Sequence, residues 1–180
     1  VVARVNLDVP GLDEPARGRI VSISRDPSGG LNALYIRRGR MPAAASQDEV
    51  LVAEAFSIAN RLEPGDAIRA VVNGRYKSLR IVGVAISPEY IYALGPGQLV
   101  PDNRRYGILW MDRKGLAAAY DMEGAFNDVA LTLGDEQVQL VNDLDVTFAA
   151  ASGTAISAGL PLPDGTIVID NLLKRTVAAA

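Results

Sequence analysis

The chain contains neither cysteine nor histidine among its 180 residues. Without cysteine it can form no disulfide, no thiolate nucleophile and no zinc–thiolate centre. Without histidine it has no Ser-His-Asp triad and no imidazole ligand for zinc. Any catalysis would therefore depend on carboxylates, lysine, tyrosine, serine or a bound cofactor.

Excess positive charge and long apolar runs are also missing. The formal net charge is −3 and the pI is about 5.0, so we expect no nucleic-acid partner. No run of about 18 apolar residues, the length that crosses a bilayer, is present. An apolar content of 49% with 22% charged residues predicts a folded chain. The first residue is Val1 and not Met, and we expect the chain to be a piece of a longer protein.

Motifs of nucleotide binding and hydrolysis are absent from the sequence. It has no G-x-S-x-G elbow, no phosphate loop ending in Gly-Lys-Ser/Thr and no EF-hand loop. Gly95-Pro96-Gly97 does not qualify as a nucleotide loop, because Pro96 removes an N–H donor. The three lysines lie in polar surroundings, which argues against a Schiff base. We predict that the protein is not an enzyme and has no catalytic residue, cofactor or metal.

Acidic residues that could act in pairs cluster in the sequence at Asp48, Glu49, Glu54 and Asp66. Caps, turns and solvated surfaces favour acidic residues at such positions, so we assign structural roles to them. The basic run at residues 37–40 could bind a phosphate or a lipid headgroup, but a solvated strand end explains it better.

The stretch from Glu49 to Val84 gives the clearest local structure. Asn73-Gly74 lies between two runs rich in β-branched residues, which predicts a hairpin with a two-residue type I′ turn. Glu63-Pro64-Gly65-Asp66 predicts a type II turn. Before that turn, a strand leads into a short helix with Phe56, Ala59 and Leu62 on one face. In the hairpin, the predicted partners are Val72 with Arg75, Ala70 with Lys77, and Ile68 with Leu79.

The flanking sequence predicts further short elements. Residues 1–9, 19–25 and 31–37 read as strands of a small antiparallel meander. Asp112 is expected to cap a helix over residues 113–122, with Leu116, Ala119 and Tyr120 buried. A strand over residues 129–133 and a second capped helix after Gly134-Asp135 follow, and residues 167–177 could be a strand or a helix. Small mixed sheets with short helices indicate an α+β fold.

Aromatic residues gather in and beside a Pro- and Gly-rich stretch, residues 90–110, which predicts a long ordered loop. Clustered aromatic side chains can form a contact surface for a protein or an apolar ligand. The candidate contact residues are Tyr90, Tyr92, Arg104, Arg105 and Tyr106. Trp110, in a strand-like segment, is expected to be buried.

Several of these stretches, in order, resemble one family. The runs RRGRMP (37–42) and DEVLVAEAFSIANRLEPGDAIRAVVNGRYKSLRIVGV (48–84) resemble the MacB-like periplasmic core domain of FtsX-like ABC-transporter permeases. SPEYIYALGPGQLVPD (87–102), RYGILWM (105–111) and GAFNDVALTL (124–133) are similar to the version found in permeases of lipid or hydrophobe export. The resemblance covers about residues 19–133.

The resemblance implies a domain on the periplasmic, extracytoplasmic face of the cytoplasmic membrane, between two transmembrane helices of the parent protein. It implies two subdomains, one inserted in the other, which we place at residues 38–125, with 1–37 and 126–180 as the flanking half. The expected partners are those transmembrane helices, a separate ATPase subunit or domain, and a periplasmic protein or lipid. The function expected from it is non-catalytic transmission of ATP-driven motion to that partner or to a lipidic substrate.

Two other functions stay open. A lipid- or ligand-binding module could contact its cargo directly through residues 90–110. A β-barrel domain of a cytosolic enzyme is the second, because L-x-P-G-D followed by a glycine-tipped hairpin also occurs in double-psi and related barrels. An apolar span within about 30 residues upstream of Val1 is expected for the permease and not for the enzyme.

Overall fold

Two units, Val1–Ala125 and Phe126–Ala180, make up the chain in the computed structural model, which describes residues 1–24, 32–132 and 166–170. The first unit contains β1 (Val2–Asp8), β2 (Ala16–Ile23), β3 (Tyr35–Gly39), β4 (Glu49–Ala53), α1 (Glu54–Asn60), β5 (Ala67–Val72), β6 (Arg75–Ile86), the 3₁₀ turn η1 (Pro88–Tyr90), β7 (Tyr106–Asp112) and α2 (Arg113–Ala119). The second contains β8 (Asp128–Thr132) and β9 (Thr166–Asp170).

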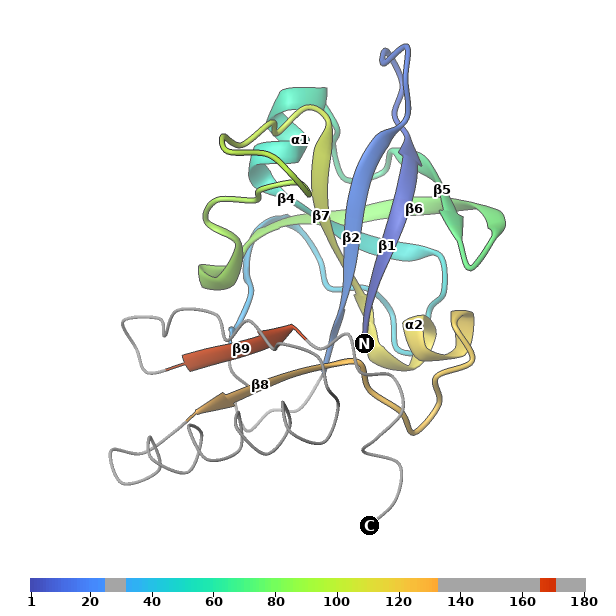
Figure 1. Ribbon diagram of the computed structural model, residues 1–180. Helices are drawn as coiled ribbons and strands as arrows, with labels where there is room; N and C mark the ends of the chain where they lie inside the picture. The colour runs from blue at the N-terminus through green and yellow to red at the C-terminus, as the bar shows by residue number, and fades with distance from the viewer. Residues whose placement is uncertain (25–31, 133–165, 171–180) are drawn as a thin grey trace. The chain divides into compact units, whose positions relative to one another are not determined.

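Six strands of the first unit close into a β-barrel (Figure 1). Their order is β6-β4-β7-β2-β1-β5, and β5 pairs again with β6, while β3 pairs with β6 outside the ring. The β2–β7 and β4–β6 pairs are parallel, and the other pairs are antiparallel. A ring of this kind leaves no open edge except along β3.

Strand β6 closes the ring because it is long enough to serve two neighbours. Its first half, from Arg75 to Arg80, pairs with β5, and its second half, from Arg80 to Ala85, pairs with β4. The register shifts by one residue between Val50 and Leu51 of β4, where the ladder is irregular. Such bulges bend and twist a strand, which lets β6 turn from one partner to the next.

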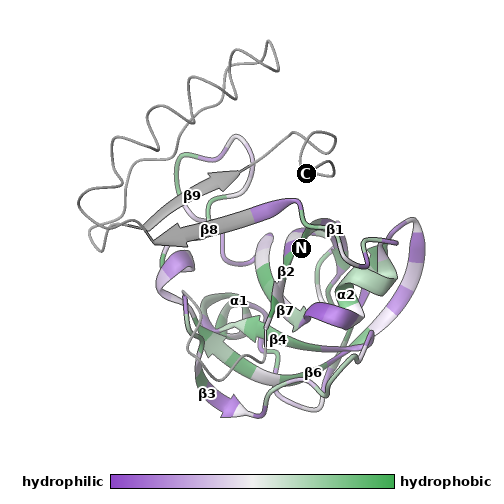
Figure 2. Ribbon diagram, turned by 90° about the horizontal axis from the view of Figure 1, so that it is seen from below, coloured by the Kyte–Doolittle hydropathy of each residue, from purple (hydrophilic) through white to green (hydrophobic). Residues whose placement is uncertain are grey.

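The inside of the barrel is apolar. Alternate residues of the strands point inward, and the side chains of Leu7, Ile20, Ile68 and Leu79 are fully buried. Figure 2 shows mostly hydrophobic residues along β4 and β7 and hydrophilic residues at the end of β3. A smaller cluster of buried residues lies around Trp110, which is 2% exposed as expected.

The local predictions of turns and caps are confirmed. The hairpin has the three predicted residue pairs, and both turn residues, Asn73 (φ 47°) and Gly74 (φ 74°), adopt the positive φ of a type I′ turn. Gly65 has φ 107°, and the Asp66 N–H donates to the Glu63 carbonyl at 3.0 Å. The Asp112 carboxylate caps α2 by accepting from the Lys114 N–H at 3.0 Å.

The predicted α+β fold is wrong, because the first unit is a mostly β structure closed into a barrel. Strands β1 and β2 belong to the same ring as β4–β7, so residues 1–24 lie in one unit with residues 38–125. The predicted meander is wrong for its third strand, since β3 pairs with β6 and not with β2. The predicted face of helix α1 is wrong at one position, because Ala59 is exposed and Ser57 is buried instead.

The second unit is described by its two strands alone. Strand β8 pairs with β9 in an antiparallel ladder. Residues 129–133 were expected as a strand, and β8 covers nearly the same positions, while β9 begins the segment that the sequence left open. The helix predicted after Gly134-Asp135 lies outside the described residues. No helix among the described residues is both long and apolar enough to cross a bilayer.

Candidate functional site

Among the described residues, exposed apolar side chains gather on the loop that follows β6 and η1, here called the apolar loop (residues 90–101). None of its twelve residues is charged. Five large side chains on it are exposed, at 73% for Ile91, 79% for Tyr92, 48% for Leu94, 96% for Leu99 and 71% for Val100. Apolar side chains concentrated in one exposed segment, in contrast to single ones, mark a contact site.

Both ends of the apolar loop are held by hydrogen bonds and packing. The Ser87 hydroxyl accepts from the Glu89 N–H at 3.2 Å and caps η1. The ring of Tyr90 packs edge-on against Trp110, with 6.2 Å between ring centroids. At the far end, one carboxylate oxygen of Asp102 accepts from the N–H groups of Arg104 and Arg105, each at 3.1 Å.

The middle of the apolar loop is a turn. The Gln98 N–H donates to the Gly95 carbonyl at 3.0 Å, and the Gln98 side-chain oxygen accepts from the Gly95 N–H at 3.0 Å. These two hydrogen bonds between Gly95 and Gln98 close the turn, and Leu99 and Val100 follow it directly. The exposed side chains are therefore presented by an ordered backbone, which lowers the entropy cost of binding.

The five predicted contact residues separate into three groups. Tyr92 is exposed on the apolar loop, as a contact residue should be. Tyr90 and Tyr106 pack against the cluster around Trp110, so they support the loop. Arg104 and Arg105 are exposed where the loop returns to β7, and Arg105 forms a 3.6 Å ion pair with Glu14.

Sequence reasoning about aromatic residues missed the aliphatic members of this surface, Ile91, Leu94, Leu99 and Val100. The signal that could have found them is the run of twelve uncharged residues between Glu89 and Asp102. A surface loop of that length normally carries charge. Its absence here distinguishes the apolar loop from a connection that only faces water.

The basic run before β4 has a structural role. Arg40 donates to both carboxylate oxygens of Glu49 at 2.8 Å, and Arg80 and the Ala43 N–H also donate to that carboxylate. Although the Glu49 side chain is only 5% exposed, these donors, with Arg40 first, lower its pKa to about 2. Arg37 and Arg38 pair with Glu54 and Glu63.

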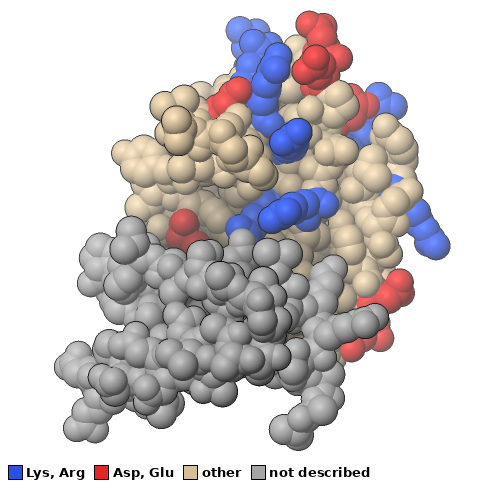
Figure 3. All heavy atoms as spheres, in the orientation of Figure 1, with Lys and Arg blue, Asp and Glu red and all other residues tan. Residues whose placement is uncertain are grey.

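A groove of about 520 Å³ runs over the outer side of four neighbouring strands, β7, β2, β1 and β5. It is here called the arginine groove. Arg4, Asn6 and Arg17 lie on its floor. In Figure 3, basic side chains gather over β1 and β2 at the centre of the face, and acidic side chains lie toward its margins.

Other carboxylates of the described residues make hydrogen bonds within the fold. Among the described residues, no three acidic side chains converge where they could hold a metal ion. Asp112 caps α2 and accepts from the Ala45 N–H at 2.9 Å, and Asp66 accepts from the Glu63 N–H at 2.8 Å. Their hydrogen bonds agree with the structural roles assigned from the sequence.

The comparison with protein families matches no family model, and the comparison with curated proteins gives no significant match.

Proposed function

We propose that the chain is a non-catalytic binding domain that contacts lipid through the apolar loop. The observation that carries this proposal is the exposure of five large apolar side chains on one ordered, uncharged segment of a closed barrel. Exposed apolar surface of this kind is costly in water and is stabilised when an apolar phase or partner covers it.

Lipid is the partner whose chemistry suits the apolar loop and its flanks. Tyr92 carries an aromatic ring with a polar hydroxyl, the combination favoured at membrane interfaces. Arg104 and Arg105 follow the loop, and their guanidinium groups are suited to the phosphates of lipid headgroups. Leu99 and Val100, at 96% and 71% exposed, would enter the apolar layer. Burying one leucine side chain contributes about 1.5–3 kcal/mol.

The domain is proposed to belong to an FtsX-like ABC-transporter permease of lipid export, on the extracytoplasmic face of the membrane. The support is the ordered series of sequence motifs from residue 19 to residue 133. In that setting, ATP hydrolysis takes place in a separate subunit or domain. The barrel then acts as a rigid body that transmits motion to the lipid held at the apolar loop.

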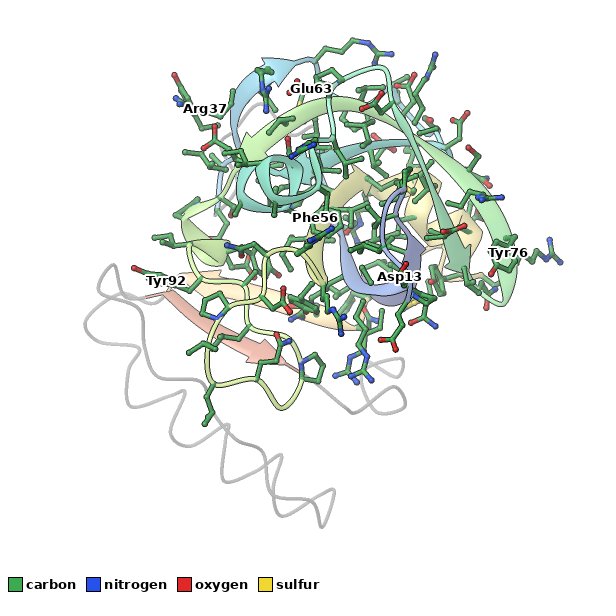
Figure 4. All side chains as sticks on the ribbon, turned by 90° about the horizontal axis from the view of Figure 1, so that it is seen from above. Asp13, Arg37, Phe56, Glu63, Tyr76 and Tyr92 are labelled. Atoms are coloured by element: carbon green, nitrogen blue, oxygen red, sulfur yellow. The ribbon has the colours of Figure 1, made fainter. Side chains whose placement is uncertain are left out.

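Vesicle binding tests the proposal. Tyr92→Asp and Tyr76→Asp form a matched pair, because the two tyrosines are 79% and 76% exposed and lie on opposite sides of the barrel (Figure 4). Co-sedimentation with neutral phosphatidylcholine vesicles should fall at least about tenfold for Tyr92→Asp and for Leu99→Asp, a loss of about 1.4 kcal/mol or more. Tyr76→Asp should bind as the unchanged chain does.

The fluorescence of Trp110 provides a second measurement of vesicle binding. Trp110 is the only tryptophan, and its ring contacts Tyr90 at the base of the apolar loop. Its fluorescence should change when vesicles are added to the unchanged chain and should stay constant for Leu99→Asp. Equal sedimentation of the Tyr92 and Tyr76 variants, or no sedimentation of the unchanged chain, would refute lipid contact by this loop.

A barrel domain of a cytosolic enzyme is the second candidate, and the observation that favours it is the closed six-stranded ring. The arginine groove would then be its substrate site. The sequence upstream of Val1 separates the two candidates, because the permease requires an apolar span within about 30 residues and the enzyme does not.

A further inference from the structure

The arginine groove brings two like charges together on adjacent strands. In the β1–β2 ladder Asn6 pairs with Arg17 and Arg4 pairs with Arg19, so Arg4 and Arg17 are diagonal neighbours on the outer side of the barrel. Diagonal neighbours lie about 7–8 Å apart at Cα, within reach of long side chains. Like charges at such positions repel, which is unfavourable unless an anion lies between them.

Neither guanidinium is neutralised within the described part of the chain. The side chains of Arg4 and Arg17 make no hydrogen bond or ion pair to any described residue, whereas Arg37, Arg38, Arg40, Arg69, Arg80 and Arg105 each pair with a carboxylate. No aspartate or glutamate is among the described residues that line the groove. Arg61, Arg75 and Arg113 also form no ion pair with a described residue, but they do not line the groove, whereas Arg4 and Arg17 lie together on one concave surface.

The other polar residues of the groove could complete the binding of an anion. Asn6 and Asn73 add amide groups, and Tyr106 and Tyr120 add hydroxyl groups at its two sides. Tyr120 is half-buried, and Asn73 at the hairpin tip lines the same groove. A volume of about 520 Å³ lies within the range of small-molecule sites.

We propose that the arginine groove binds a phosphate group. Two guanidinium forks present up to ten N–H donors, more than the two oxygens of one carboxylate can accept, whereas a phosphate has three or four oxygens to share between them. The groove is distinct from the apolar loop, although Pro96 of that loop lies at its side. The phosphate is carried either by a lipid headgroup or by a soluble molecule, and the chemistry of recognition is the same.

Isothermal titration of the full chain tests the groove with two probes, inorganic phosphate and short-chain dihexanoyl phosphatidic acid below its micelle concentration. Arg4→Gln and Arg17→Gln should each weaken binding at least about tenfold, and the double variant should abolish it. Arg113→Gln, an exposed arginine on α2 outside the groove, serves as the matched control and should bind normally. Arg17→Lys should recover only part of the affinity, because lysine keeps the charge and loses the fork.

The two probes distinguish the source of the phosphate. Equal affinities indicate a soluble phosphorylated ligand, whereas tighter binding of phosphatidic acid that Leu99→Asp reduces to the level of inorganic phosphate indicates a lipid. Absence of saturable binding of both probes, or unchanged binding by the double variant, would overturn the proposal. Neutral vesicles would still report lipid contact by the apolar loop in the double variant, so the two proposals can fail separately.

Discussion

Glu49 illustrates how one residue can hold a long connection in place. Its carboxylate accepts from two arginines and from the Ala43 N–H, which ties the segment between β3 and β4 to the barrel. The sequence predicted a structural role for Glu49, because caps, turns and solvated surfaces favour acidic residues at such positions. It could not predict Arg80 as a partner, because that contact depends on the parallel pairing of β4 with β6.

Replacing Glu49 by glutamine should make the free energy of unfolding less dependent on pH in the acidic range. The pKa is about 2 in the folded chain and about 4.3 in an unfolded one, so the carboxylate stabilises the fold fully above about pH 4.5 and loses its contribution as the pH falls toward 2. We expect Glu49→Gln to lower the free energy of unfolding by about 2 kcal/mol at pH 7. This is less than the full pKa difference would give, because Arg40 and Arg80 are over half exposed and water screens their charges.

Urea unfolding at pH 7, 4 and 2 measures this difference. The difference in the free energy of unfolding between the wild-type chain and Glu49→Gln should become smaller as the pH decreases, provided that both chains remain folded without urea. Glu54→Gln is the control, because its partner Arg37 is 48% exposed, so water screens the pair and it should contribute much less to stability than the Glu49 carboxylate. A gap that stays constant across the three pH values would contradict the assignment.

Elements that are determined by residues close together in the sequence agree with the prediction. Elements whose pairing partners lie far away in the sequence do not. The β5–β6 hairpin, the type II turn and the Asp112 cap depend on residues within a few positions of one another. β3 was placed in a meander because it follows β2 in the sequence, yet its partner β6 comes some 45 residues later. β2 carries Arg17 and Arg19 at alternate positions and β1 carries Arg4, a pattern visible in the sequence, but only the β1–β2 register shows that these arginines lie near one another.

Helix α2 contains a position where the usual helix preference should be reversed. Alanine at an exposed helix position is about 1 kcal/mol better than glycine. A Cβ atom on Gly115, however, would lie 1.9 Å from the carbonyl oxygen of Ser46, which is backbone and cannot rotate away. Gly115→Ala should therefore lower the free energy of unfolding by about 1–3 kcal/mol.

Thermal and urea unfolding of two helix variants would check this reversal. Lys114→Gly, at the exposed neighbouring position, should cost about 1 kcal/mol through helix preference alone. If Gly115→Ala is more stable than the unchanged chain, then α2 does not pack against the backbone at Ser46.

For the whole molecule, closure of the barrel decides which part of the chain can fold by itself. Nothing in the local pattern of β6 shows that its two halves serve different partners, so the sequence predicted two small sheets where the structure has one ring. The strands of that ring are all contained in Val1–Ala125. A fragment that ends at Ala125 should therefore fold cooperatively, with the emission of a buried Trp110.

A shorter fragment that ends at Arg104 is the control for closure. It lacks β7, which joins β2 to β4, and without that strand the ring is open at both of those edges. We expect it to show no cooperative urea transition by circular dichroism, because the remaining strands, in the order β4-β6-β5-β1-β2, form an open sheet that can no longer enclose the core. If the fragment 1–125 is unfolded as well, then residues 126–180 contribute to the barrel, and the two units are not independent. If both fragments fold, β7 is not required for folding, and closure of the ring does not determine the stability of the barrel.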